Sequence, residues 1–323
     1  MISDEILAEC AARAALAPTV HNTQPARWVR DDGVLSLFCD TDVGLAVGDP
    51  SGRDAALSCG AVLEGMVLAL SAHGIGAKVD LTGRDTAPRQ GLVAVAHLTL
   101  TNDGVEDVLH HRLEQRFTWR GAFDTAQVDL FGWTRADTRM VLDAPSRAWL
   151  AARNDKASHD IMQDRRFRAE LLSWMRLSGR HPRAGLDGMD RAAMRMTGWE
   201  ARFAPFVLGP FWRGLGLIGA TKGVVAERDA TLTAPVIALF MREKTENPVV
   251  SGQAYLRLCL EAASLGLAGW PMAALSDHPA TNADIRARFG VPDDRRLVQV
   301  IRFGRPTDAT PPRARRPLSE VLR

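Results

Sequence analysis

Two stretches of the chain share one pattern of apolar positions. Residues 60–74 carry apolar side chains at positions 63, 66, 67 and 70, and residues 252–266 carry them at 255, 258, 259 and 262. This i, i+3, i+4, i+7 spacing predicts a helix that buries one face in each stretch. Each stretch begins and ends with glycine, and Gly74 and Gly266 stand where a helix C-terminus favours positive φ.

The repetition predicts an internal duplication. The two stretches lie 192 residues apart (252 − 60 = 192), which is too far for a solenoid repeat. An apolar run follows each predicted helix, at residues 92–100 and 297–303, so each half contains a helix and then a strand. Two half-molecules in one chain can build one site between them, with functional residues split along the sequence.

Elsewhere the pattern predicts further strands and helices and one irregular segment. Further strands are predicted at residues 27–30, 34–39, 77–81 and 234–241, with a hairpin turn at 31–33. Further helices are predicted at residues 3–16, 106–115 and 146–176. Residues 178–228 read as irregular, and residues 307–323 form a tail rich in proline and arginine.

Composition and charge are those of an ordinary soluble protein. The 323 residues carry a net charge of +2 and 24% charged side chains, which argues against bulk affinity for nucleic acid. The longest apolar stretch, residues 203–217, is short and interrupted, so no membrane span is expected. The N-terminus lacks a basic signal region, and four cysteines without CxxC spacing favour reduced thiols. We therefore expect a cytoplasmic protein with no membrane partner.

Arg116, Thr118 and Arg120 form the first candidate site. In an extended segment, residues two apart point the same way, so two guanidinium groups and a hydroxyl would share one side. Arginine pairs with phosphate oxygens through two parallel hydrogen bonds, which makes the triplet a candidate phosphate clamp. The alternative is a solvated edge strand with surface arginines.

The loop at residues 17–25 gathers short polar side chains, with Thr19, Asn22 and Gln24 following Pro18. Such loops present backbone N–H groups and amides to a ligand. The alternative is a plain connection whose side chains satisfy local turns. His21 reads as a loop residue rather than a metal ligand, because no histidine or acid stands at ligand spacing around it.

A second cationic group lies in the tail, at Arg313, Arg315 and Arg316. Its alternative interpretation is a solvated basic terminus.

Residues 214–220 fit the G-x-G-x-x-G/A fingerprint of dinucleotide-binding loops. That fingerprint needs a strand before it and a helix after it, so we prefer a Gly-rich covering segment. The His110–His111 doublet stands without partners, and no metal-binding, nucleophile-elbow or P-loop motif occurs. No metal is expected.

Together these pieces resemble the nitroreductase superfamily, and within it the fused, double-length Acg-type branch. Residues 116–120 resemble the family's Arg-x-Ser-x-Arg/Lys strand, and residues 17–25 resemble its Pro-Ser-x-x-Asn-x-Gln-Pro-Trp loop. Residues 266–272 resemble its Gly-Leu-Gly-type segment, and residues 313–321 resemble its cationic tail.

The resemblance implies an α+β, nitroreductase-like fold. Two homologous half-domains, residues 1–105 and 106–323, would form an intrachain pseudo-dimer. An irregular helical lid would occupy residues of about 150–228 within the second half. Because each half holds motifs that the other lacks, the resemblance implies one FMN site per chain and one degenerate site.

In this family FMN lies where two subunits meet. Arg116, Arg120 and the tail arginines would bind its phosphate, Thr118 would lie near the ribityl chain, and the segment after Gly266 would run along the flavin ring. The implied cofactor-binding residues are Pro18, Thr19, Asn22, Gln24, Arg116, Thr118, Arg120, Gly266, Leu267, Gly269, Trp270, Arg313, Arg315 and Arg316. No catalytic acid or base is assigned.

Two departures from the family pattern concern the substrate side of the pocket. The family's Gln-Pro-Trp is Gln-Pro-Ala-Arg-Trp here, so Trp28 is not expected in the usual place. Trp270 stands where smaller or sulfur-bearing residues are common.

The resemblance implies an FMN-dependent oxidoreductase. It would transfer a hydride from NAD(P)H through FMN to a nitroaromatic, quinone or activated-alkene acceptor. Two alternatives remain: a protein that sequesters FMN with little turnover, and an FMN-dependent dehydrogenase or desaturase of one metabolite. Fused halves allow either a monomer or a homodimer.

Overall fold

Two antiparallel sheets form the frame of the computed structural model, which describes residues 2–31, 34–81, 89–130 and 132–323. The first sheet has the order β1-β2-β4-β3 and the second β10-β11-β9-β6, with β5 pairing β11. The first comprises β1 (Ala26–Asp31), β2 (Val34–Asp40), β3 (Gly76–Asp80) and β4 (Leu92–Thr101). The second comprises β5 (Phe123–Asp124), β6 (Thr138–Val141), β9 (Val236–Glu243), β10 (Ala268–Pro271) and β11 (Arg295–Pro306). All six predicted strands are confirmed, while the predicted turn residues 32–33 lie outside the described residues.

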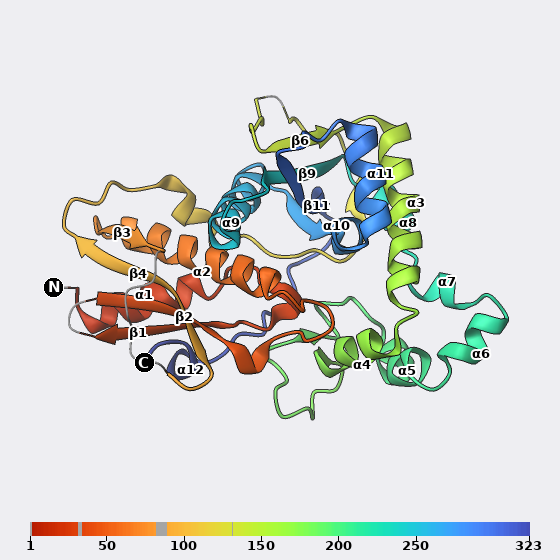
Figure 1. The fold of residues 1–323 in the computed structure, drawn as a ribbon, viewed down its shortest axis with the longest axis horizontal. Helices are drawn as coiled ribbons and strands as arrows, with labels where there is room; N and C mark the ends of the chain where they lie inside the picture. The colour runs from red at the N-terminus through yellow and green to blue at the C-terminus, as the bar shows by residue number, and fades with distance from the viewer. Residues whose placement is uncertain (1, 32–33, 82–88, 131) are drawn as a thin grey trace.

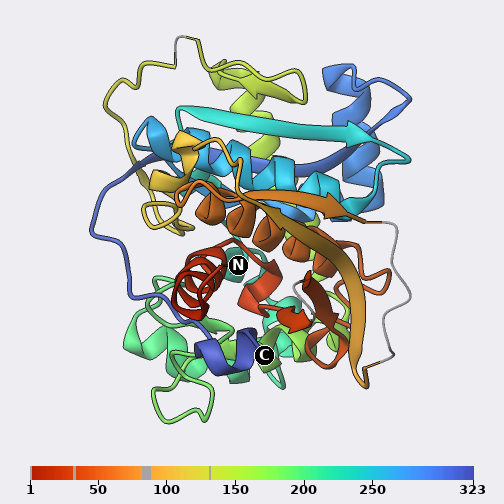
Figure 2. The ribbon, with the colours of Figure 1, turned by 90° about the vertical axis from the view of Figure 1, so that its left-hand side faces the viewer.

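Two long helices lie side by side in the middle of the molecule, as Figures 1 and 2 show. They are α2 (Arg53–Ser71) and α9 (Pro248–Ser264), the helices predicted from the repeated apolar pattern. Gly74 and Gly266 follow them with φ of 67° and 72°, as their positions predict.

Equivalent residues of α2 and α9 make reciprocal contacts where the two helices cross. A Cβ on Gly60 would lie 2.0 Å from the carbonyl oxygen of Val249, and a Cβ on Gly252 would lie 2.0 Å from that of Leu57. Adding 192 to 57 and to 60 gives 249 and 252, so each contact is the counterpart of the other. Reciprocal contacts of this kind are those that a two-fold axis produces. They are what the predicted pseudo-dimer requires.

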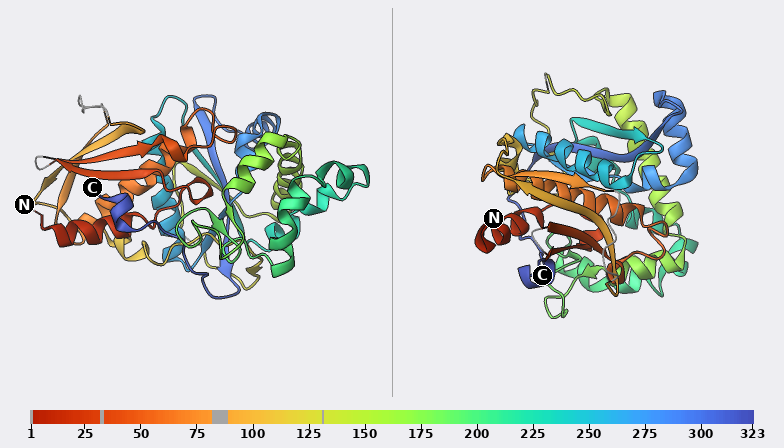
Figure 3. Two further views of the ribbon diagram at one scale, coloured as in Figure 1. Left: turned by 90° about the horizontal axis from the view of Figure 1, so that it is seen from below. Right: turned by 60° about the vertical axis from the view of Figure 1, so that its left-hand side comes forward.

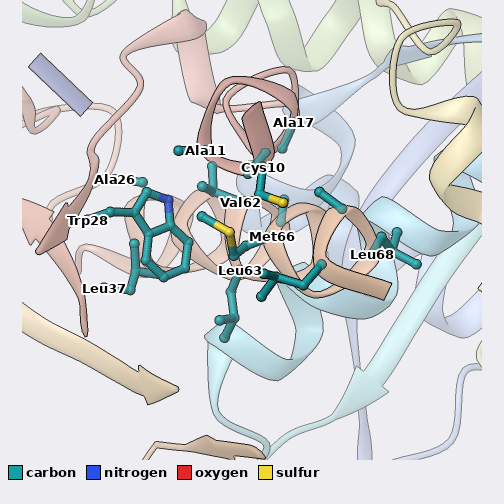
Figure 4. Close-up of a cluster of buried hydrophobic side chains, with 14 of the residues drawn as sticks. Cys10, Ala11, Ala17, Ala26, Trp28, Leu37, Val62, Leu63, Met66 and Leu68 are labelled. Atoms are coloured by element: carbon teal, nitrogen blue, oxygen red, sulfur yellow. The ribbon is translucent and has the colours of Figure 1, made fainter. Parts of the chain in front are cut away.

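The helix α2 is a core helix. It is long and apolar enough to cross a membrane by length and composition, but 72% of that apolar window is buried inside the molecule. Figure 4 shows Val62 and Met66 of this helix beside Trp28 of β1. Trp28 is fully buried there, so it belongs to the core of the first half. The four cysteines are free, as expected.

The segment predicted as a lid is more regular than expected. The single helix predicted at 146–176 is wrong, because Met162 ends α3 and the Asp164 side chain caps α4 by accepting from the Arg166 N–H. A capping box between Thr197 and Glu200 starts α5 within a region expected to be irregular. The segment comprises α3 (Ala144–Ile161), α4 (Arg165–Ser173), β7 (Met175–Arg176), β8 (Met189–Asp190), α5 (Gly198–Leu208), α6 (Trp212–Leu217), α7 (Thr221–Val224) and α8 (Arg228–Leu232).

The Gly-rich fingerprint at 214–220 is not a dinucleotide loop. Gly214 and Gly216 lie inside α6, and α5 rather than a strand precedes it. A Rossmann site at this position is therefore wrong, because the loop cannot present its N–H groups between a strand and a helix.

The tail returns to the first half. The Arg323 N–H donates to the Trp28 carbonyl at 2.9 Å, and Leu322 forms a parallel bridge with Trp28. The helix α12 (Leu318–Val321) precedes this contact. The remaining elements are α1 (Asp4–Ala14), η1 (Val20–Asn22), η2 (Thr41–Val43), η3 (Val108–Arg112), α10 (Ala273–Asp277) and α11 (Pro279–Phe289). The helix predicted at 106–115 is thus only the short 3-10 turn η3.

Candidate functional site

A cavity of about 1330 Å³ is lined by residues from the N-terminal and C-terminal parts of the chain and from the 158–227 segment. Its walls include the loop at 18–22, the segment at 116–120 and the tail at 311–315. Single-ligand pockets measure roughly 300–1,000 Å³. This cavity therefore has room for a cofactor and a second ligand.

Nine of the fourteen predicted residues line this cavity. They are Pro18, Thr19, Asn22, Arg116, Thr118, Arg120, Trp270, Arg313 and Arg315. The tertiary structure thus brings together parts of all four motifs, which lie up to about 300 residues apart in the chain.

Gln24 and Arg316 lie outside the cavity and hold the tail in place. The Gln24 amide donates to the Leu186 carbonyl at 2.9 Å and accepts the Arg316 N–H at 2.9 Å. The Arg316 guanidinium pairs with Asp187 at 2.7 Å and with Glu320 at 3.0 Å. Both residues therefore position the wall rather than face a ligand.

Gly266, Leu267 and Gly269 also lie outside the cavity lining. Gly266 follows α9 with positive φ, and Leu267 is buried in the core of the second half. A Cβ on Gly269 would lie 2.7 Å from the Phe303 ring. The missing side chain of Gly269 therefore makes room for Phe303 rather than for a ligand.

The loop at 18–24 has an unusual backbone. His21, Asn22 and Gln24 have φ of 45°, 56° and 52°, a region that non-glycine residues rarely adopt. The Asn22 side chain holds the loop by donating to the Gly188 carbonyl at 2.9 Å and accepting from Arg315 at 3.0 Å. Asn22 therefore also orients a cation of the tail.

Arg116, Arg313 and Arg315 form a cationic cluster at one end of the cavity. Among the described residues none of the three forms an ion pair, and the Nε atoms of Arg116 and Arg315 are buried without a hydrogen-bond partner. Burial, and then the charges of Arg116 and Arg313, lower the pKa of Arg315 to about 9. Uncompensated buried charge is costly, so this cluster is suited to an anion such as a phosphate group.

Arg120 lies apart from that cluster. Burial lowers its pKa, and the carboxylates of Glu227 and Asp190 partly offset that effect. Burial, and then the Arg120 charge, lower the pKa of His21 to about 4. His21 is therefore a neutral cavity residue at pH 7. The sequence interpretation missed it, because its cationic neighbour is about a hundred residues away.

Trp270 forms a fixed flat wall. The Arg302 guanidinium lies over the indole ring at 3.5 Å from the centroid. Arg302 is fully buried and pairs with Glu227 on its other side. This stack holds the ring plane in place against the cavity.

The 158–227 segment contributes many apolar side chains to the cavity, alongside several carboxylates. Its contribution includes the side chains of Met162, Met175, Met189, Met194, Met196 and Phe167. Methionine is flexible and polarizable, so such a wall can adapt to ligands of different shape.

Two carboxylates, Asp54 of α2 and Asp277 of α10, also line the cavity. Burial, and then the Asp54 charge, raise the pKa of Asp277 to about 7, while Arg53 lowers it. The Asp277 side chain is 34% exposed, and that part adjoins the cavity. A carboxyl group that keeps its proton near neutral pH can donate a hydrogen bond to a ligand.

Asp277→Asn is expected to change how stability depends on pH. Between the ordinary pKa of 3.8 and about 7, the folded state binds more protons than the unfolded state, so wild-type stability falls as pH rises. Solvent screens part of this effect, because the Asp277 side chain is partly exposed. We therefore expect Asp277→Asn to raise the free energy of unfolding at pH 8 by about 1–2 kcal/mol and to change it little at pH 4. Urea denaturation at both pH values measures this difference.

The exposed Asp293 supplies the control, since Asp293→Asn should alter stability equally at both pH values. An Asp277→Asn effect that is equal at pH 4 and pH 8 would contradict the raised pKa.

His110 and His111 do have an acidic neighbour, which corrects the expectation of an isolated doublet. The His110 Nε2 lies 2.8 Å from Glu106, and the three side chains could group around a cation. However, Arg13 donates to the His110 Nδ1 at 3.2 Å, so the ring proton lies on Nε2 and points at Glu106. The group therefore reads as a hydrogen-bond network.

Comparison with known proteins finds relatives along nearly the whole chain. No protein-family model matches. Two Mycobacterium tuberculosis proteins with the provisional name NAD(P)H nitroreductase, MT3217 and Rv3131, are 28% identical over 321 residues, covering 96% of this chain and 88% of theirs. Proteins provisionally named NAD(P)H nitroreductase acg, from the same species, are 40% identical over 80 residues, so the chain matches only 24% of their length.

Solved structures show a more distant likeness. The FMN-dependent nitroreductase NfnB from Mycobacterium smegmatis, solved in complex with NADPH, is 19% identical with a TM-score of 0.35, covering 62% of this chain and 89% of that one. A protein from Anabaena variabilis provisionally named a nitroreductase is 10% identical with a TM-score of 0.43, covering 84% of this chain and 69% of that one.

Proposed function

We propose that this chain, which belongs to the nitroreductase superfamily, binds one FMN in its cavity and transfers a hydride from NAD(P)H through it to a small-molecule acceptor. The observation that carries the proposal is the cluster of Arg116, Arg313 and Arg315. These three guanidinium groups form no ion pair among the described residues, although the Glu114 carboxylate acts on Arg313 from beyond ion-pair distance. A phosphate group supplies the charge that this cluster lacks.

The residues present fit FMN at both ends of the cavity. Arg116, Arg313 and Arg315 would hold the phosphate, and the hydroxyl of Thr118 would hydrogen-bond beside them. The fixed face of Trp270 would lie along the flavin ring. FMN supplies the hydride-carrying chemistry, while the protein binds, orients and shields it.

Arg120 would act on the ring rather than on the phosphate. It lies apart from the phosphate cluster, beside the neutral His21 and near Glu227. A buried cation near a flavin ring favours the form that carries negative charge. Asp277, whose pKa is raised to about 7, is a cavity group that could hold or donate a proton near neutral pH, whereas the neutral His21 would act as a hydrogen-bonding group.

The acceptor would contact the methionine-rich wall. That wall is apolar and adaptable, which suits nitroaromatic, quinone or activated-alkene compounds. The proposed stoichiometry is one FMN per chain, because the loop at 18–22 comes from the first half and the arginines come from the second. A cytoplasmic location and a monomeric or homodimeric state remain predictions.

The visible spectrum of the purified protein tests the function. We expect flavin absorbance at about one FMN per chain, rapid bleaching by anaerobic NADPH or NADH, and recovery with an added quinone or nitroaromatic. Flavin that binds but is not bleached would favour the sequestering alternative. Flavin that is bleached only by a specific metabolite would favour a dehydrogenase. A colourless protein that takes up no FMN on titration would refute all three.

A further inference from the structure

The helices α6 and α7 project from the body of the molecule, and α5, which packs beside α4, leads into them, as Figures 1 and 3 show. We define the distal arm as residues 199–224. Its outer face carries large apolar side chains that are exposed to solvent. They are Phe206, Phe211, Leu217 and Ile218. Trp199, Phe203 and Val224 of the distal arm are also exposed, but they line the cavity.

The aromatic side chains of the distal arm form a continuous strip. Trp199 stacks on Phe203 at 5.8 Å between ring centroids, and Phe206 stacks on Phe211 at 6.0 Å. Phe203 and Phe206 join the two pairs at 6.5 Å. Leu217 is 91% exposed and Ile218 is 77% exposed. A contiguous apolar surface of this kind marks an interaction site.

The inner face of the distal arm is already packed. Leu208 and Trp212 are buried in a core cluster with Met162, and the Arg168 guanidinium lies over Trp212 at 4.9 Å from the ring centroid. The exposed strip is therefore a second apolar surface of the distal arm, separate from the face that packs against the core. The part of the strip outside the cavity lining is Phe206, Phe211, Leu217 and Ile218, whose exposed fractions are 48%, 56%, 91% and 77%.

The free charge beside the strip is positive. Arg202, Arg213 and Lys222 are exposed, and among the described residues they form no ion pair. The acid in the same stretch, Glu200, is engaged in the capping box with Thr197. The distal arm thus combines an apolar strip with three exposed cations that form no ion pair among the described residues.

We propose that the distal arm docks on the surface of a membrane that contains anionic lipids. Aromatic and aliphatic side chains beside unpaired cations are the composition of elements that lie in the lipid interface. A two-fold contact between copies of this chain would instead bring like charges together. Residues 203–217 are too short to span a bilayer, but docking on its surface needs no spanning helix.

Vesicle sedimentation with the full chain tests this proposal. We expect the protein to pellet with vesicles of phosphatidylglycerol and phosphatidylcholine, to bind pure phosphatidylcholine less, and to release as salt is raised. Leu217→Glu combined with Ile218→Glu should lower the bound fraction at least tenfold. Arg213→Glu combined with Lys222→Glu should abolish the preference for anionic vesicles.

The matched control is Val105→Glu, at a site 86% exposed and outside the distal arm, which should bind like the wild type. Circular dichroism confirms folding of each variant. Equal pelleting by the Leu217/Ile218 variant overturns the proposal, as does a wild type that pellets with no vesicle. If the wild type is a dimer and the Leu217/Ile218 variant is a monomer, the strip binds a second copy of this chain and the membrane proposal is wrong. FMN binding is measured separately, so a failure of the membrane-docking proposal can be distinguished from a failure of the proposed FMN-dependent function.

Discussion

Arg116→Met is expected to weaken FMN binding at least about 30-fold, because removing one member of a buried charge pair costs about 2–5 kcal/mol. Without FMN, the same variant should be as stable as the wild type or more stable. Arg116 is buried, has no carboxylate partner among the described residues, and has an Nε without a hydrogen-bond partner. Methionine keeps an apolar side chain of similar length and removes the charge. Flavin titration and urea denaturation of the apo-protein measure the two effects.

Arg316→Met is the matched control for that result. Arg316 belongs to the same tail but pairs with Asp187 and Glu320 outside the cavity. Its loss should destabilise the fold, by about 1–3 kcal/mol, and leave the FMN dissociation constant within about threefold. The phosphate-cluster assignment is wrong if both variants lose FMN equally, or if Arg116→Met loses stability and keeps FMN.

Gly60→Ala is expected to destabilise the protein by about 3 kcal/mol or more. The added Cβ would lie 2.0 Å from the carbonyl oxygen of Val249, so the backbones of α2 and α9 would have to separate. Overpacking costs about 1–3 kcal/mol where side chains can adjust. Here the added Cβ would meet backbone atoms, which cannot move aside in this way, so the cost should be at the upper end of that range or above it. Gly252→Ala should cost the same within about 1 kcal/mol, because its contact with Leu57 is the counterpart of the first. Urea denaturation measures both losses.

Gly214→Ala is the matched control for the helix crossing. Gly214 lies inside α6, and a Cβ there would meet no atom within 4 Å. Alanine should therefore stabilise that helix by about 0.5–1 kcal/mol. A Gly60→Ala protein as stable as the wild type would show that the two helices can separate at little cost.

Most of the central frame was predictable from local patterns. The apolar stripes at 63–70 and 255–262 predicted α2 and α9, and alternating or continuous apolar runs predicted β2, β4 and β11. The helices of the 150–228 segment were harder. The apolar pattern runs past Asp164, so the break between α3 and α4 was missed, and Thr197 precedes Gly198 and Pro205, which argue against helix.

The candidate site was predictable only in part. The spacing of Arg116, Thr118 and Arg120 indicated one shared side, and all three line one cavity. The neighbours Arg315 and Arg316 looked equivalent in sequence, yet one lies in the cavity and the other pairs with Asp187. Only partners distant in the chain separate the two, so no local spacing could have distinguished them.

The sequence by itself determined the two central helices, their glycine ends and the types of side chain available for a phosphate site. These follow from interactions between residues a few positions apart, which periodicity and caps record. Only the tertiary structure decided which arginines cluster in one cavity without an ion pair among the described residues, why His21 is neutral, and which side chains of the distal arm stay exposed. Burial and charge neighbours decide these properties, and they arise where the fold brings distant segments together.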